Sequence, residues 1–128
     1  MESDGISELD RFERGEFDPK TFRHSEHVRI AHDMLRRERF VEALPRYARG
    51  IRKMAERAGR PEAYNETITT AFLALIAERM RNKSVTDFAT FSAVNADLFE
   101  KHALDRHYTR ERLQSPDARS TFLLPDRA

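Results

Sequence analysis

The sequence predicts an all-α fold: an up-and-down bundle of four main helices followed by short C-terminal helical segments. Apolar residues recur at helical spacing along most of the chain, and no stretch shows the apolar and polar alternation that is typical of strands. Hydrophobic residues make up 39% of the chain and charged residues 35%. Such a mixture is typical of long amphipathic helices that bury one face.

The length predicts one domain, because 128 residues are too few for two ordinary domains. Residues 1–21 are expected to form an N-terminal extension with a short helical turn near 7–14. Residues 22–128 are expected to form a single helical bundle domain.

The first two main helices should be amphipathic. Over residues 22–37, both histidines of HSEH and the following apolar positions share one face. His32 lies off this stripe and is expected at the surface. Residues 40–58 carry a second apolar stripe and a basic outer face, and Gly59 is a suitable C-terminal cap.

The third helix should be the most buried. It is expected from Pro61 to Arg81, and its middle, ITTAFLALIA (68–77), is apolar on nearly every side. A fourth helix is expected over 87–94 with Thr86 as its N-cap, and the rest of the chain should break into short helical pieces.

Polar residues cluster at the beginnings of the first and third helices. Short connections favour antiparallel neighbours, so these two helices should run in the same direction and begin side by side. His24 and His27 would then meet Glu66 in a desolvated corner, as two imidazoles and one carboxylate. These three groups are the candidate ligands for a transition metal such as zinc or iron, with Glu66 also a candidate general base.

Four further residues are candidates for binding at the same corner. They are polar side chains of the third helix, the returning fourth helix and the tail: Asn65, Thr67, Asn95 and Tyr108. Three interpretations remain open for the corner: a structural hydrogen-bonded cluster, a metal site, and a metal-free pocket for a small molecule. The chain contains neither H-E-x-x-H nor Glu-x-x-His, so neither a zincin nor a ferritin-like site is predicted.

Three segments together resemble an uncharacterised family of short bacterial all-helical proteins, over about residues 17–126. They are FRHSEHVRIA (22–31), YNETITTAF (64–72) and HYTRERLQSPDARSTF (107–122). The family pattern Phe-x-His-x-acid-His falls on Phe22, His24, Glu26 and His27. Its His-Glu-Thr motif falls on residues 65–67, where Asn65 replaces the histidine, and its Tyr-Ser/Thr-x-x-x-Leu segment on Tyr108, Thr109 and Leu113. The resemblance implies a site at these positions and no particular activity.

Composition limits the classes of partner. The 23 basic and 22 acidic residues give a formal charge of +1, which does not favour nucleic acid as a partner. The chain has no cysteine, and its longest apolar run is too short to cross a membrane. We therefore expect a soluble, cytoplasmic protein that binds a small molecule or acts as a metal-dependent enzyme. The alternative is a non-catalytic module that docks a protein partner through its second helix or its aromatic tail.

Overall fold

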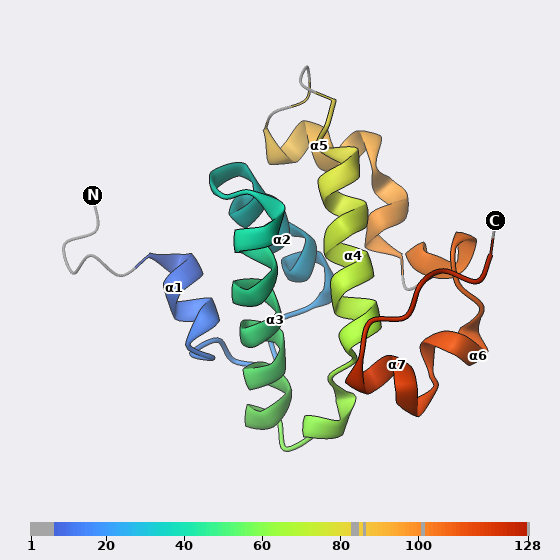
Figure 1. Cartoon of the computed structure of the whole chain (residues 1–128). Helices are drawn as coiled ribbons and strands as arrows, with labels where there is room; N and C mark the ends of the chain where they lie inside the picture. The colour runs from blue at the N-terminus through green and yellow to red at the C-terminus, as the bar shows by residue number, and fades with distance from the viewer. Residues whose placement is uncertain (1–6, 83–84, 86, 101, 128) are drawn as a thin grey trace.

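Helix α4 (Glu66–Arg79) lies at the centre of the structure, as its apolar sequence predicts. The computed structural model describes residues 7–82, 85, 87–100 and 102–127. Helices α2, α3 and α7 all contact α4 (Figure 1). Its buried side chains include Phe72, Leu73 and Ile76, so α4 contributes to the core on more than one face.

The all-α class is confirmed, and no strand occurs among the described residues. The other main helices are α2 (His24–Arg37), α3 (Phe40–Arg57) and α5 (Phe88–Val94), within two residues of their predicted bounds. Thr86, the predicted cap of α5, lies outside the described residues, and the Asp87 side chain accepts from the backbone N–H of Thr90 instead. None of the helices that the structure describes combines the length and the apolarity needed to span a bilayer.

The third predicted helix begins later than expected. Residues Pro61–Ala63 form a 3₁₀ turn (η1), and α4 starts only at Glu66. Asn65 has an extended backbone, and its Oδ1 accepts from the Ile68 N–H at 2.8 Å. Asparagine is a strong N-cap because its short side chain satisfies a helix N–H that has no partner within the helix, so the helix begins after this residue.

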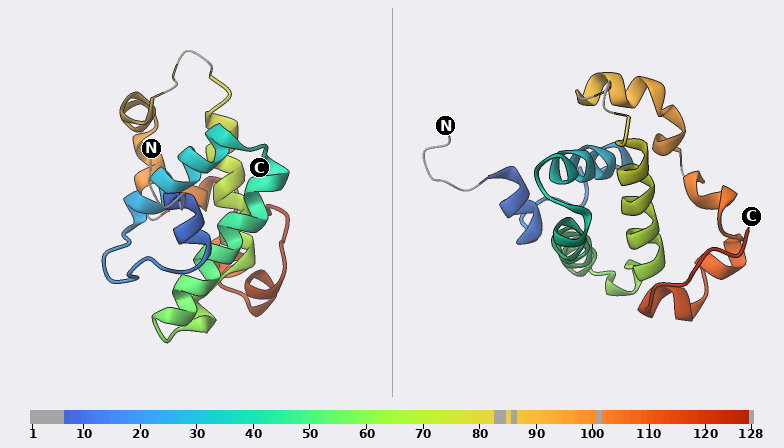
Figure 2. Two further views of the ribbon diagram at one scale, coloured as in Figure 1. Left: turned by 90° about the vertical axis from the view of Figure 1, so that its left-hand side faces the viewer. Right: turned by 45° about the horizontal axis from the view of Figure 1, so that its top comes forward.

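Helices α3 and α4 run alongside each other in opposite directions, but α2 crosses both at a steep angle (Figure 2). The first residue of α2 consequently meets the middle of α4. The His24 ring lies 5.2 Å from the Phe72 ring, centroid to centroid. The predicted side-by-side start of the first and third helices is therefore wrong.

The described part of the N-terminal region contributes to the same core as the bundle. Helix α1 (Glu8–Glu13) packs on α3, and Phe12 is fully buried with its ring 5.9 Å from that of Tyr47. Gly50 of α3 lies under this ring, where an added Cβ would come within 2.3 Å of a Phe12 ring carbon. The contact between α1 and α3 thus requires a residue without a side chain at position 50.

The C-terminal part consists of short helical pieces, as predicted, followed by an extended segment. The pieces are η2 (Ala96–Phe99), η3 (Ala103–Arg106), α6 (Arg110–Leu113) and α7 (Pro116–Ser120). Ser115 caps α7 by accepting from the Ala118 N–H at 3.2 Å. Residues 121–127, here called the C-terminal strap, then run back past the start of α4 (Figure 1).

Replacing Phe12 with alanine tests the contribution of α1 to the core. We expect the free energy of unfolding to fall by about 3–5 kcal/mol, because a large buried ring is lost and its cavity cannot fully collapse. Phe122→Ala is the matched control; this ring is 42% exposed, and its loss should cost less than about 1 kcal/mol. Urea denaturation measures both, and equal losses would contradict the described packing.

Candidate functional site

The predicted metal ligands lie at different places along α4. His24 donates from Nε2 to the Leu98 carbonyl at 2.9 Å, beside Phe72. Glu66 accepts from the Tyr64 hydroxyl at 2.7 Å, at the start of α4. Phe72 follows Glu66 by six residues, which is roughly 9 Å along a helix axis. The His24 imidazole and the Glu66 carboxylate therefore form hydrogen bonds with different residues.

The structure therefore does not bring His24, His27 and Glu66 together as the metal prediction requires. Within the described chain, no three His, Asp or Glu side chains are close enough to hold a metal ion. These residues are apart because α2 crosses α4 at a steep angle (Figure 2). A short connection between helices does not fix the angle at which they cross. The role of Glu66 as a general base stays a prediction.

His27 is partly buried and packs against aromatic rings. Its ring lies 4.7 Å from that of Phe22 and 6.0 Å from that of His24. Burial, together with the nearby charge of His24, lowers the pKa of His27 to about 4. The imidazole is therefore neutral at pH 7.

Three of the predicted binding residues do come together, but they hold the C-terminal strap and its neighbours. Thr67 Oγ1 donates to the Thr121 carbonyl at 2.7 Å and accepts from the Leu123 N–H at 3.0 Å. The Tyr108 hydroxyl donates to the Leu123 carbonyl at 2.8 Å. Asn65 Nδ2 donates to the Leu113 carbonyl at 2.8 Å. These polar groups are thus engaged by the protein's own main chain.

Asn95 lies near the other end of α4. Its Oδ1 accepts from Arg79 Nη1 at 2.9 Å, and the same guanidinium holds Asp97 at 2.7 Å. Helix α5 has only seven residues, about 10 Å of rise, and cannot return along the length of α4. The prediction that Asn95 joins the Glu66 end of the bundle is therefore wrong.

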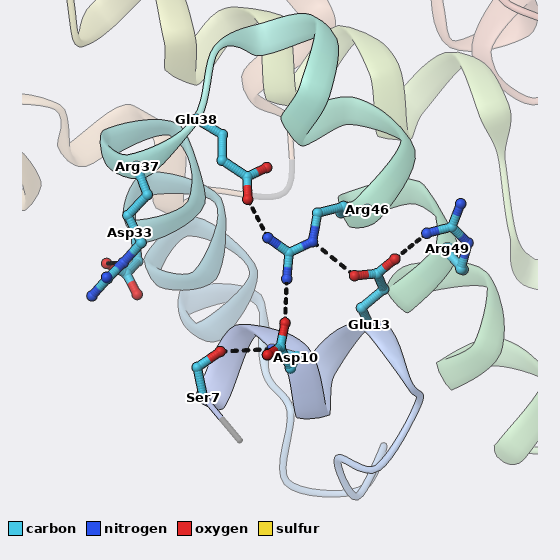
Figure 3. A network of polar contacts seen from close by, with 8 residues as sticks. All are labelled: Ser7, Asp10, Glu13, Asp33, Arg37, Glu38, Arg46 and Arg49. Atoms are coloured by element: carbon cyan, nitrogen blue, oxygen red, sulfur yellow. Dashed lines mark hydrogen bonds and ion pairs between the residues drawn. The ribbon is translucent and has the colours of Figure 1, made fainter. Parts of the chain in front are cut away.

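Helix α1 covers part of the basic face of α3. Arg46 donates to Glu13 at 2.7 Å, to Asp10 at 2.8 Å and to Glu38, and Arg49 also binds Glu13 (Figure 3). The Arg46 side chain is only 21% exposed. This network neutralises the charges of Arg46 and Arg49 within the protein, whereas the exposed Arg57 of the same face donates to the Gly15 and Phe17 carbonyls.

A large cleft lies where α2, the start of α3 and the end of α4 meet, and its lining also includes Arg81, Asn82, Val85, Asp87 and Phe88. We call it the α2–α5 cleft; its volume is near 940 Å³. Its lining combines charged groups with apolar side chains from each of these segments: Leu35, Phe40, Ala77, Met80, Val85 and Phe88. Sequence reasoning did not predict this cleft, because it depends on the crossing of α2.

His32 is the residue of this cleft that the sequence analysis placed wrongly. It is only 3% exposed, although it was expected at the surface. Helix α5 covers this side of α2, so the His32 ring lies 4.7 Å from that of Phe91 and 5.3 Å from that of Phe88. Its spacing of four residues from buried Val28 was the available signal.

The His32 imidazole makes no hydrogen bond to any residue in the described part of the chain, although it lines the cleft. Burial, and then the charge of Arg36, lower the pKa of His32 below its usual range. A neutral imidazole has one nitrogen that donates and one that accepts. The cleft therefore offers a hydrogen-bonding group whose partner is not supplied by the described residues.

The carboxylates that line the cleft are engaged by the protein. Asp33 pairs with Arg36 at 3.0 Å and with Arg37 at 3.1 Å. Glu38 binds Arg46 through Oε2, whereas its buried Oε1 has no hydrogen-bond partner in the described chain. The Asp87 carboxylate accepts from the Thr90 N–H at 3.0 Å and caps α5.

Comparison of the chain with protein-family models, curated proteins and solved structures finds no match. The resemblance noted from the sequence motifs is not tested by these comparisons and remains a prediction. The site must therefore be judged from its own geometry and chemistry.

The depressed pKa of His27 predicts a loss of stability in mild acid. The unfolded chain takes up the proton near pH 6.5, but the folded chain takes it up only near pH 4. Stability is thus fully present above pH 6.5 and falls toward pH 4, by about 2 kcal/mol between pH 7.5 and pH 5. Urea denaturation at both pH values should show this extra loss in the wild type relative to His27→Gln. Identical losses in the two proteins would show that His27 is charged in the folded state.

Proposed function

We propose that the protein binds a small molecule in the α2–α5 cleft and that this binding does not use a metal held by His24, His27 and Glu66. The observation that carries the proposal is the state of His32: nearly buried, neutral, and without a hydrogen-bond partner in the described chain. The ring nitrogens of His32 are not among the fully buried unpartnered atoms of the described chain, so they are accessible from the cleft that the residue lines. A ligand in the cleft would supply the missing hydrogen bond.

The size and chemistry of the cleft support this proposal. Small-molecule sites are commonly about 300–1,000 Å³ and combine an apolar lining with a few polar groups. The α2–α5 cleft has a volume near 940 Å³, with Phe40 and Phe88 as aromatic walls. His32 supplies a polar group that could orient a ligand between them.

The alternative, a non-catalytic module that docks a protein partner, has less support. The basic face of α3 is partly occupied by α1 through Arg46 and Arg49. The tail is folded back along α4, where Thr67 and Tyr108 bind its main chain. Both expected docking elements are thus partly engaged within the protein, although Val41 of α3 and Phe122 and Leu124 of the tail are exposed.

A neutral aromatic probe tests the proposal directly. We expect 1-naphthalenemethanol to bind the full chain and to shift NMR signals of His32, Phe40 and Phe88. Ala77→Phe fills the cleft from α4 and should weaken binding by at least tenfold, because the new ring occupies the ligand volume. Ala74→Phe, on an exposed position of the same helix, should leave binding unchanged.

Two outcomes would contradict the proposal. Signal shifts confined to the strap or to α3 would place the site elsewhere. Equal affinity of the wild type and Ala77→Phe, with Ala77→Phe folded by circular dichroism, would show that the cleft is not occupied.

A further inference from the structure

We infer that the ligand of the α2–α5 cleft is an organic acid that carries one negative charge on an apolar or aromatic body, with its acid group held by Arg39 and Arg81. This inference rests on the proposed function and adds the chemical class of the ligand.

Arg39 and Arg81 are the cationic groups of the lining that lack an ionic partner within the described part of the chain. Arg39 lies between α2 and α3, and Arg81 follows the end of α4, so the two come from different segments of the cleft. Both are exposed. In contrast, Arg29 pairs with Glu8 at 2.8 Å and with Glu26 at 2.7 Å, and Arg36 pairs with Asp33.

The charge of the lining indicates a single negative charge on the ligand. The four arginines are Arg29, Arg36, Arg39 and Arg81, and the three acids are Asp33, Glu38 and Asp87. Four positive charges and three negative charges leave a net charge of +1, with the imidazole neutral. One carboxylate would neutralise this balance, whereas a phosphate monoester would leave an excess negative charge beside the three acids.

The start of α3 adds to the attraction for an anion. Arg39 is the N-cap residue of this 18-residue helix, and no side chain caps the helix there. The helix dipole and the N–H groups of the first turn favour negative charge at this position. Phe40, the first residue of α3, lines the cleft, so the helix start and the unpartnered His32 face the same volume.

The two kinds of lining fit the two parts of such a ligand. Guanidinium groups bind carboxylates through paired, charge-assisted hydrogen bonds. The apolar body would pack against Phe88, Leu35 and Met80, and His32 could donate to or accept from a polar atom of the ligand. The arrangement therefore selects for an amphipathic acid over either a purely polar anion or a neutral hydrocarbon.

Three naphthalene probes and two variants test this inference by isothermal titration calorimetry. We expect 1-naphthoate to bind the wild type at least tenfold more tightly than 1-naphthalenemethanol, and more tightly than 1-naphthyl phosphate. Arg39→Met and Arg81→Met should each weaken naphthoate by about fivefold or more and leave the alcohol unchanged. Arg60→Met removes an exposed arginine that does not line the cleft and should change neither affinity.

The outcomes separate this inference from the proposed function. If the alcohol binds the cleft and naphthoate binds no more tightly, or if neither variant weakens naphthoate, the acid assignment is overturned while the small-molecule site stands. Tighter binding of the phosphate overturns the single-charge assignment. If neither the alcohol nor naphthoate binds the cleft, both the inference and the proposed function are overturned.

Discussion

The need to cover α4 on several sides is the constraint on which the rest of the structure depends. The segment from Ile68 to Ala77 carries few polar side chains, so leaving any side of it in water would expose apolar surface. The described residues form three other main helices, and one of them, α5, has seven residues. Different segments therefore cover different parts of α4.

The candidate site lies at the C-terminal end of α4, where the covering segments leave a cleft. The strap and α7 cover the beginning of α4 through the two hydrogen bonds of Thr67. The start of α2 covers the middle through the contact between His24 and Phe72. At the far end, α2 and α5 leave the cleft in which Ala77 and Met80 are still part of the lining. The cleft is thus a consequence of how the central helix is covered, and its charged rim follows from the helix ends that meet there.

More of the fold than of the site could be predicted from the sequence. Helices follow from a local periodicity, whereas the angles at which helices cross depend on contacts between distant segments. The bounds of α2, α3 and α5 follow from the spacing of apolar residues, and the burial of Leu73 and Ile76 follows from the apolar run around them. The steep crossing of α2 depends on packing between distant segments. That crossing separated His24 from Glu66 and buried His32 on a second covered side of α2.

The sequence motifs indicated the right residues for a different role. Asn65, Thr67 and Tyr108 are gathered in space as expected, but their polar atoms bind the main chain of the C-terminal part. Residues that bind a ligand and residues that bind carbonyls of their own chain can be of the same types and have the same spacing in the sequence. Only the path of the strap, which local pattern does not encode, distinguishes the two.

Native-state hydrogen exchange of the full chain tests the central role of α4 most directly. We predict that the amides of the middle of α4 exchange only on global unfolding, so that their opening free energy equals the free energy of unfolding from urea denaturation. Amides of α1 and the strap should open at lower cost, because fewer buried contacts hold these segments. A lower opening free energy for the amides of α4 than for those of α2 or α3 would contradict the account.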